Sequence, residues 1–433
     1  MLVTKEHTVE RKYRCTGSSR AKFVIYIMQV LTFGWDYPPI RNGGLGVACQ
    51  GLTEELIQAG LEVIFVLPRS QPTVGRPNFR FANSGGTVRV RELAFPLMRP
   101  YQSGSSFVEY FLADGRSIRV NRSILDEARR YAIEAAKIAL EEEFDIIHAH
   151  DWTAYLAGIA AQEVSDKPLV LHVHATAYDQ AGGGHGDPDI RAIEMEAFAR
   201  ADSIVAISNY TRNVLIDKYN VTPHKVVVVH NGVNLCPIEP LTPVLTEYKA
   251  QGKKIVFYNG RITIQKGVDY FVRAARRVID VNPNVVFVIS GWGDMEHEII
   301  RLVGALGLSE HVIFAGALWD EERDRMYQSA DLVVMPSVSE PFGLVPLEAI
   351  QHGTPVLISK QSGVAEVLAH ALKVDFWDVE EMANKIIAAL DYPVMNAQLV
   401  REGRLELLKI TWRHAASKVV DLYHSLLGWW KKR

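Results

Sequence analysis

Arg261 and Lys266 are two cations placed where a strand is expected to turn into a helix. Arg261 follows Gly260 at the end of an apolar run, and Lys266 precedes Gly267. Glycines at such a turn let backbone N–H groups approach an anion, and the two side chains add positive charge. A pair of surface cations would be commonplace, but this placement predicts a phosphate or diphosphate receptor.

Two carboxylates follow a later apolar run. Glu340 stands in the segment SEPFGL (339–344), which is expected to be a loop, and Glu348 stands in the helix-like segment after it. Carboxylates bind sugar hydroxyls through charge-assisted hydrogen bonds, so the pair could hold a carbohydrate. Glu348 could equally be a solvated acid in the first turn of a helix, where the macrodipole favours negative charge.

Histidines close two other apolar runs, in HAHDW (148–152) and HVH (172–174). On a strand, His148 and His150 would point the same way and Asp151 the opposite way. The pair could ligate a metal, but no third ligand is evident nearby, so we expect no metal site. Each histidine could instead be a hydrogen-bonded residue at a strand end.

Two glycine-rich segments complete the candidate chemistry. NGGLG (42–46) precedes an expected helix at 47–59, where backbone N–H groups could meet an anion. The segment is not the dinucleotide fingerprint, and no acidic residue ends the second strand, which argues against NAD. The run 182–184 is costly to order and marks a loop that moves or admits a ligand.

The elements that must position these residues are apolar runs alternating with helix-like segments. The runs are apolar throughout, as expected for parallel strands buried on both faces, and helical patterns lie between them, as at 123–143, 268–280 and 295–306. This alternation predicts an α/β fold with doubly wound sheets. The expected strands are 23–31, 63–68, 145–150, 168–175, 203–208 and 226–230, then 254–260, 285–291, 312–316, 331–337 and 355–359.

The break in this alternation predicts two Rossmann-like domains facing across a cleft. Ligands of such sheets bind outside the carboxyl ends of the strands, so the cleft is the expected site. The predicted organisation is a polar N-terminal extension (1–21), an N-terminal domain (22–236), a proline-rich linker (237–253), a C-terminal domain (254–408) and a C-terminal helix crossing back (409–433).

Composition excludes several classes of protein. The 433 residues include 47 basic and 50 acidic side chains, so the basic excess of a nucleic-acid binder is missing. Cys15, Cys49 and Cys236 lie far apart, which argues against a disulfide scaffold or structural zinc and favours a reducing, cytoplasmic compartment.

No membrane segment is expected. The apolar run 23–31 follows a mildly basic stretch, but it lacks a cleavage site, so a buried strand is favoured over a secretory signal. No other stretch reaches the roughly 18 apolar residues of a membrane helix. The helical tail from 405 ends in Trp429-Trp430 and three cations, which could touch a membrane surface but are expected to pack back on a domain.

Together these motifs resemble the retaining GT-B glycosyltransferases of group 1, most closely their glycogen and starch synthase-like branch. The resemblance covers about residues 22–425, and SEPFGLVPLEAIQHGTPV (339–356) carries its most specific pattern. HAHDW and the Gly-Gly-Leu turn point further towards glycogen synthases. Four other motifs follow in the order and spacing of the class: AISNYT (206–211), HNGVN (230–234), GRITIQKG (260–267) and SGWGD (290–294).

The resemblance implies a role for each matching residue. Arg261 and Lys266 would neutralise the diphosphate leaving group. Glu340 would lie beside the donor sugar, and Glu348 would hold the ribose hydroxyls. His174 would meet the donor sugar, and Asp151 would lie near the sugar and the acceptor. The other donor-binding residues would be Gly44 and Leu45 at the phosphate, Gly291 and Gly293 at the base, and Asn209, Phe342, Gly343 and Leu344.

Three positions depart from the glycogen synthase pattern. Arg41 stands where those enzymes often carry a lysine, Phe342 where bacterial ones carry a cysteine, and Glu348-Ala349 where they carry tyrosine-alanine. These departures place the chain nearer the broad nucleotide-sugar transferases, whose acceptors range from polysaccharides to lipids and small sugars.

The predicted activity is retaining transfer of a hexosyl group, with glucosyl favoured, from an ADP- or UDP-sugar to a hydroxyl acceptor. An α-glucan, as oligo- or polysaccharide, is the favoured acceptor; a small sugar, sugar phosphate or lipid is the alternative. No metal or other cofactor is expected, because the two cations serve the diphosphate. Other hypotheses are a sugar-nucleotide epimerase, which the EPFGL pattern disfavours, and a non-catalytic sugar-nucleotide-binding subunit.

Overall fold

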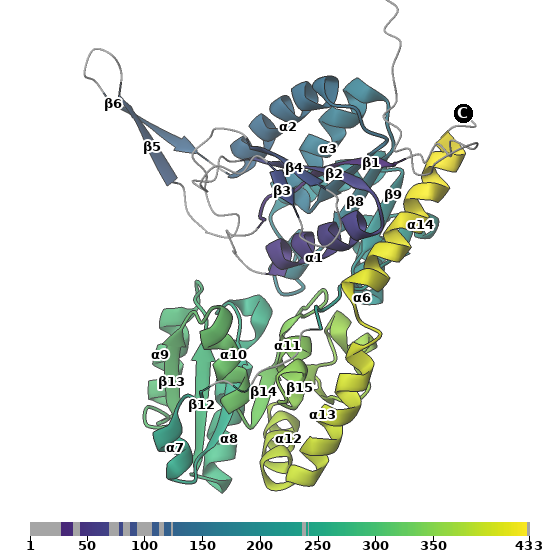
Figure 1. The fold of residues 1–433 in the computed structure, drawn as a ribbon. Helices are drawn as coiled ribbons and strands as arrows, with labels where there is room; N and C mark the ends of the chain where they lie inside the picture. The colour runs from purple at the N-terminus through teal and green to yellow at the C-terminus, as the bar shows by residue number, and fades with distance from the viewer. Residues whose placement is uncertain are drawn as a thin grey trace, which may run out of the picture.

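The computed structural model contains two parallel sheets, one in each half of the chain (Figure 1). It describes residues 27–37, 44–68, 78–80, 87–92, 106–111, 117–122, 124–235, 240 and 242–430. Several residues named above lie outside the described ranges: Arg41, Asn42, Gly43, Cys15, Cys236, the N-terminal extension, residues 237–239 and 241 at the start of the proposed linker, and the last three cations.

The first sheet has the strand order β10-β9-β8-β7-β1-β2-β4-β3. All its neighbouring strands are parallel except β3, which runs antiparallel to β4. Its strands are β1 (Gln29–Phe33), β2 (Glu62–Leu67), β3 (Asn78–Arg80), β4 (Thr87–Glu92), β7 (Ile146–His150), β8 (Leu169–Val173), β9 (Ser203–Ala206) and β10 (Val226–Val228). A separate antiparallel pair, β5 (Ser106–Phe111) and β6 (Ser117–Arg122), projects from this half (Figure 1).

The second sheet has the order β13-β12-β11-β14-β15-β16, and every neighbouring pair in it is parallel. Its strands are β11 (Lys254–Asn259), β12 (Val285–Ser290), β13 (Val312–Gly316), β14 (Leu332–Met335), β15 (Val356–Ser359) and β16 (Leu372–Val374).

Helices connect the strands and cover the sheets. The α-helices are α1 (Gly44–Gln58), α2 (Ile124–Glu141), α3 (Trp152–Ser165), α4 (Ala177–Gln180), α5 (Pro188–Arg200), α6 (Asn209–Tyr219), α7 (Thr246–Ala250), α8 (Val268–Val281), α9 (Glu296–Ala305), α10 (Asp320–Ser329), α11 (Val345–Gln351), α12 (Val379–Asp391), α13 (Pro393–Leu407) and α14 (Trp412–Trp430). Three short 3₁₀ turns are η1 (Pro223–Lys225), η2 (Ile264–Lys266) and η3 (Gly363–Glu366).

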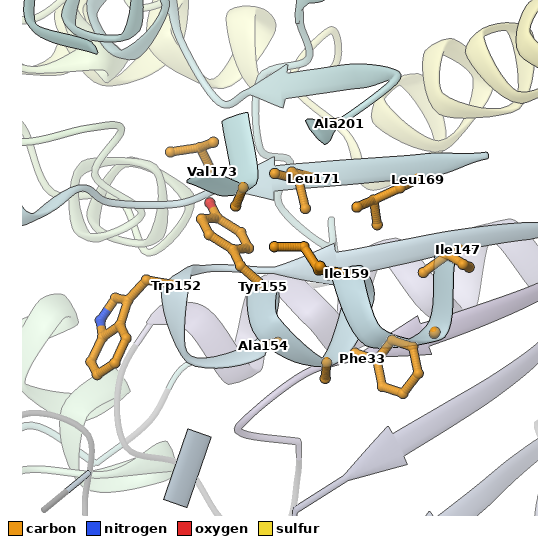
Figure 2. Close-up of a cluster of buried hydrophobic side chains, with 14 of the residues drawn as sticks. Phe33, Ile147, Trp152, Ala154, Tyr155, Ile159, Leu169, Leu171, Val173 and Ala201 are labelled. Atoms are coloured by element: carbon orange, nitrogen blue, oxygen red, sulfur yellow. The ribbon is translucent and has the colours of Figure 1, made fainter. Parts of the chain in front are cut away.

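Alternate side chains of the buried strands pack on opposite faces of the first sheet, which is why the strands are apolar throughout. Leu31 of β1 belongs to the core under α2 and α3, whereas its neighbour Val30 belongs to the core under α1 and α14. Figure 2 shows part of the first core, where Tyr155 of α3 lies close to Leu171 and Val173 of β8.

The C-terminal helix α14 returns from the second half of the chain and packs on the first (Figure 1). It joins the core of α1 through Trp412, Val419 and Tyr423, all of them buried. The segment that leads from the first half to the second lies beside the segment that leads back to α14. Val233 of the former forms a β-bridge with Thr411 of the latter and donates its N–H to the Ile410 carbonyl oxygen at 2.9 Å.

The predicted α/β architecture of two doubly wound sheets is confirmed, and the sequence pattern missed several smaller elements. Strands β3 to β6 and β16 were not predicted, and α7 lies inside the segment read as linker. The tail read as one helix from 405 is instead the end of α13 and the separate α14. Trp430 donates its indole N–H to the Asp166 carbonyl oxygen at 3.2 Å. Among the described residues, no helix is long and apolar enough to cross a membrane.

Replacing Gly51 with alanine should loosen the contact between α1 and α14. A Cβ at this position would lie 2.4 Å from the Trp412 ring, so the helices would have to move apart. We expect Gly51→Ala to lower the free energy of unfolding by about 1–3 kcal/mol, the usual cost of overpacking. Gly304→Ala in α9 is the control: a Cβ there meets nothing within 4 Å, so a gain of about 0.5–1 kcal/mol is expected. Urea unfolding measures both, and equal effects would contradict the proposed tightness of the α1–α14 contact.

Candidate active site

A cavity of about 310 Å³ lies between the carboxyl ends of the two sheets. The strand order reverses between β1 and β7 in the first sheet and between β11 and β14 in the second. The loops at such a reversal diverge and leave a crevice, and here the two crevices face each other. The cavity lining includes Gly44, Leu45, Asp151 and His174 from the first half, and Gly260, Arg261, Lys266, Gly291, Glu340, Phe342, Gly343, Leu344 and Glu348 from the second.

Lys266 and Glu340 form an ion pair on the wall of this cavity. The Lys266 Nζ lies 2.6 Å from Glu340 Oε2, and Ser337 Oγ donates to the same carboxylate oxygen at 3.1 Å. Gly267, next to the lysine, has φ of 65°, and a Cβ there would lie 2.2 Å from the Pro336 carbonyl oxygen. This close approach of η2 to the end of β14 brings the two charges together.

Arg261 is held at the end of β11 by contacts to its own loop. Its Nη2 donates to Gln265 Oε1 at 3.1 Å, and the Tyr258 hydroxyl donates to the Arg261 carbonyl oxygen at 2.6 Å. Gly291, after β12, has φ of 137°, and a Cβ would lie 1.8 Å from the Gly260 carbonyl oxygen. Only glycine fits there, so the β11 and β12 loops can meet behind the cation.

Glu348 lies in the first turn of α11 and also lines the cavity. Its contact with a sugar stays a prediction. The Tyr327 hydroxyl donates to Glu348 Oε2 at 2.9 Å, and Arg323 Nη1 lies 3.8 Å from Oε1. These two residues of α10 fix a carboxylate that would otherwise rotate freely.

The two histidine pairs come together because β7 and β8 are neighbouring strands with His150 opposite His172. The rings of His148, His150, His172 and His174 stack with centroids 4.4–5.3 Å apart. This corrects the expectation that no third metal ligand lies near His148 and His150. Burial lowers the pKa of His148 and of His174 to about 3, so both imidazoles are neutral at physiological pH.

Asp151 supports the strand end that carries His174. Its Oδ1 accepts hydrogen bonds from the backbone N–H of His174 at 2.6 Å and of Ala175 at 3.2 Å. Its backbone has φ of 60°, which turns the carboxylate towards β8. Burial raises the pKa of Asp151 to about 7, although the two hydrogen bonds oppose the shift.

Polar contacts connect the two halves beside the cavity. The Tyr210 hydroxyl lies 2.8 Å from Ser339 Oγ, which donates to Asp179 Oδ1 at 2.8 Å. Ser208 Oγ donates to the Pro341 carbonyl oxygen at 2.6 Å. The glycine run also reaches across, because a Cβ at Gly182 would contact Ile264 and Val338. The Glu340 loop is therefore tied to both halves of the chain.

Two residues predicted to bind the donor lie outside the cavity lining. Asn209 instead donates from its backbone N–H and its Nδ2 to Glu366 Oε2, both at 2.9 Å. Gly293 lies against the backbone of Ile262, whose oxygen would be 2.1 Å from a Cβ. Both belong to motifs of the resemblance. In the structure, Asn209 binds the Glu366 side chain and Gly293 allows a close contact with the backbone of Ile262.

The sequence reasoning missed several residues of the lining, among them Trp292, Trp319 and Arg323. Trp292 lies inside the motif SGWGD and could have been noted from it. Trp319 directly precedes α10, and Arg323 lies in this helix. The charged sequence of the helix gave no indication of a functional role. The half-exposed Trp319 is an aromatic surface at the cavity rim.

A buried carboxyl, Glu194 of α5, lies behind the cavity. It accepts the backbone N–H of Ala177 at 3.0 Å and the Tyr219 hydroxyl at 2.5 Å. Burial raises its pKa to about 8, with the two hydrogen bonds acting in the opposite direction. The group therefore holds a proton over much of the neutral range.

Two family descriptions match successive parts of the chain. Residues 42–236 match "Glycosyltransferase Family 4" and residues 246–406 match "Glycosyl transferases group 1". An uncharacterized glycosyltransferase of Methanocaldococcus jannaschii is 28% identical, with 92% of this chain and 98% of that protein aligned. A glycogen synthase of Mycobacterium tuberculosis is 26% identical, with 92% and 94% aligned.

Solved structures share the same fold. The sucrose-phosphate synthase of Thermosynechococcus elongatus superposes with a TM-score of 0.70 at 21% identity, covering 93% of this chain and 99% of that one. The Anabaena protein HepE, in complex with UDP-glucose, superposes with a TM-score of 0.68 at 17% identity, covering 92% and 100%.

Glu194 should make stability fall as pH rises. Its folded pKa of about 8 lies above the ordinary carboxyl value of 4.5, so between these values the folded chain keeps a proton that the unfolded chain has lost. Raising the pH from 5 to 7 should therefore cost about 2 kcal/mol through this group. We expect Glu194→Gln to remove that part of the decline, and Glu196→Gln, an exposed position on the same helix, to leave it. Urea unfolding at both pH values decides, and parallel pH curves for wild type and Glu194→Gln would contradict the assignment.

Proposed function

Because the chain is a group 1 glycosyltransferase with the GT-B fold, we propose that it transfers a hexosyl group, with glucosyl favoured, from an ADP- or UDP-sugar to a hydroxyl acceptor with retention of anomeric configuration. The observation that carries the proposal is the convergence of Arg261, Lys266, Glu340 and Glu348 on one cavity that His174 faces from the other sheet. HepE, which has the same fold, binds UDP-glucose, and this supports a nucleotide-sugar donor.

The diphosphate of the donor would lie between Arg261, Lys266 and the N-terminus of α1. Gly44 and Leu45 open that 15-residue helix, and its free N–H groups favour a negative charge. As the bond to the anomeric carbon breaks, charge grows on the leaving phosphate, and fixed cations lower the barrier by stabilising it. These side chains supply positive charge without a metal ion.

Donor binding would also change the partner of Glu340. Lys266 lies 2.6 Å from this carboxylate, so an arriving diphosphate competes for the lysine. Glu340 would then be free to bind hydroxyls of the donor sugar and to favour the positive charge that develops on the ring. Glu348, which Tyr327 and Arg323 hold in place, would bind the ribose hydroxyls.

The first half of the chain would present the reacting face of the sugar and the acceptor. His174 is neutral, so it can hydrogen-bond a sugar hydroxyl without placing a positive charge beside the oxocarbenium-like centre. Asp151 holds the backbone of His174 in place. Because we assign Glu340 to the hydroxyls of the sugar and Asp151 to the backbone of His174, neither acts as a nucleophile in the proposed reaction. The departing phosphate would instead take the acceptor proton during attack on the same face.

The acceptor that we favour is an α-glucan. The similarity to a glycogen synthase over almost the whole chain supports this acceptor class. A small sugar, a sugar phosphate or a lipid is the alternative, because the chain departs from the glycogen synthase pattern at Phe342 and Glu348.

A donor and acceptor screen tests the activity. Purified protein with ADP-, UDP- and GDP-sugars and with glycogen, glucose, sugar phosphates or lipid acceptors should release nucleoside diphosphate only when the correct acceptor is present. EDTA should leave turnover within about twofold, because side chains neutralise the leaving group. The Arg261→Ala/Lys266→Ala variant is the negative control. Conversion of a sugar nucleotide without acceptor would indicate an epimerase, and activity that EDTA abolishes and magnesium restores would contradict the metal-free mechanism.

Exchanging each glutamate for glutamine separates catalysis from binding. Glu340→Gln should lower kcat by a factor on the order of 10², since it removes a charge that acts on the transition state. It should bind free nucleoside diphosphate at least as tightly as wild type, because Lys266 loses its competing partner. Glu348→Gln should mainly raise the donor KM, by about tenfold, because ribose contacts are equal in ground and transition states. Steady-state kinetics and calorimetry measure these effects, and the reverse pattern would exchange the two assignments.

A further inference from the structure

The histidine cluster at the cavity floor contains more ligand atoms than the proposed transfer reaction uses. Besides the four imidazoles, the buried thiol of Cys49 in α1 lies next to them. One ligand atom each from Cys49, His150 and His174 lies within 4.8 Å of the other two. Cys49 comes from α1, His150 ends β7, and His174 follows the neighbouring strand β8, where Asp151 Oδ1 accepts its backbone N–H at 2.6 Å.

We propose that Cys49, His150 and His174 form a binding site for a Zn²⁺ ion, which would inhibit the enzyme by occupying the floor of the donor cavity. A thiolate and two imidazoles are ligands that zinc prefers. Three protein ligands leave a fourth position for water, as in zinc sites that remain open to solvent.

The geometry of the ligand atoms suits a zinc ion after a small adjustment. His150 Nδ1 lies 3.0 Å from His174 Nε2, and two imidazole nitrogens on one tetrahedral zinc ion lie about 3.3 Å apart. One of the two nitrogens carries the proton of this hydrogen bond, and both imidazoles are neutral because burial lowers their pKa. For zinc to bind, that proton would move to the other nitrogen of the same ring. Zinc would replace this hydrogen bond by two metal–nitrogen bonds.

The charges around Cys49 also favour a dication. Burial raises the pKa of the Cys49 thiol, and the neighbouring carboxylates of Asp151 and Asp36 raise it further. The same negative charges that disfavour a thiolate attract a cation, and a bound metal ion deprotonates its thiol ligand. The Cys49 thiol is therefore protonated and a poor nucleophile, but it can still become a ligand once a metal ion binds.

A second group of possible metal ligands lies nearby, but within the described part of the chain it lacks a path by which an ion could enter. His148, His150 and His172 also bring ligand atoms within 4.8 Å, and His172 Nε2 is buried without a hydrogen-bond partner. All three of these side chains are fully buried, however, and His148 Nδ1 is engaged at 2.5 Å by the Tyr423 hydroxyl. His174 lines the donor cavity, so an ion can reach the set with Cys49 from solvent.

Metal binding tests the proposal without reference to turnover. Full-length protein washed with chelator should bind one Zn²⁺ per chain by calorimetry. Co²⁺, used as an optical probe, should show a thiolate-to-metal charge-transfer band. Cys49→Ser should abolish the band and weaken Zn²⁺ binding by more than the roughly 10–100-fold that loss of an outer-shell partner costs. Cys236→Ser is the matched control and should keep both signals.

His174→Gln provides a second variant in case Cys49→Ser does not fold. It changes a side chain at the cavity surface and should weaken Zn²⁺ binding to a similar degree while thermal melting still shows a folded protein. Wild-type protein that binds no Zn²⁺ would overturn the proposal. Binding that survives Cys49→Ser but is lost in His172→Gln would also overturn it, because the ion would then occupy the all-histidine set.

The inhibitory effect rests on the proposed function and has its own measurement. Zn²⁺ at saturating concentration should weaken binding of the sugar nucleotide at least about tenfold, because the ion takes the His174 imidazole that faces the donor sugar. Zinc binding with unchanged sugar-nucleotide affinity would overturn the inhibitory role. Failure of the protein to bind any sugar nucleotide would count against the proposed transferase, while the calorimetry and the cobalt band would still decide the metal site.

Discussion

Parallel pairing of strands is the constraint on which the rest of this molecule depends. Every strand of the second sheet and nearly every strand of the first points the same way as its neighbour, so all their carboxyl ends meet at one edge. A parallel strand can follow another only through a crossover, and the direction of the crossovers changes once in each sheet. Those two changes open the crevices, and stacking the crevices face to face creates the cavity. The polar residues of the cavity therefore lie at strand ends, in the loops that follow them, or in the helices α10 and α11, and the two sheets hold all of these in place.

Within the cavity, two charges that we assign to donor binding pair with each other. Lys266 and Glu340 neutralise each other, and Ser337 adds a hydrogen bond to the carboxylate. A partly buried cation without a partner is costly, and a partly buried anion is equally so. The ion pair holds both partly buried groups in position, and in the proposed reaction the diphosphate would compete with Glu340 for the lysine. In the same loop, Ser339 forms hydrogen bonds with Asp179 and Tyr210 of the first half. A movement of one half against the other would therefore also move the loop that carries Glu340.

The sequence was sufficient for the fold, and 12 of the 14 predicted site residues line the cavity, because most of them follow the end of an apolar run. Arg261, Lys266, Glu340 and His174 were all placed by that rule, and all of them line the cavity. The register between neighbouring strands could not be predicted from the sequence. That His150 lies opposite His172 follows from how β7 and β8 slide against each other, and no local pattern states it. Arg323 was missed because a charged helix turn looks the same whether it faces solvent or a carboxylate. Asn209 and Gly293 also belong to motifs of the resemblance, but the structure shows them in contacts between loops and outside the cavity lining.

The return of α14 to the first half has a consequence for how the protein is made. The core that contains Val30, Leu52 and Val63 also contains Trp412, Val419 and Tyr423. During synthesis the first domain is extruded early, and domains generally fold as units in that order. One face of this domain must nevertheless wait for α14, which begins more than 350 residues after the end of α1. Until the ribosome has translated α14, the apolar side of α1 that it covers stays exposed to solvent.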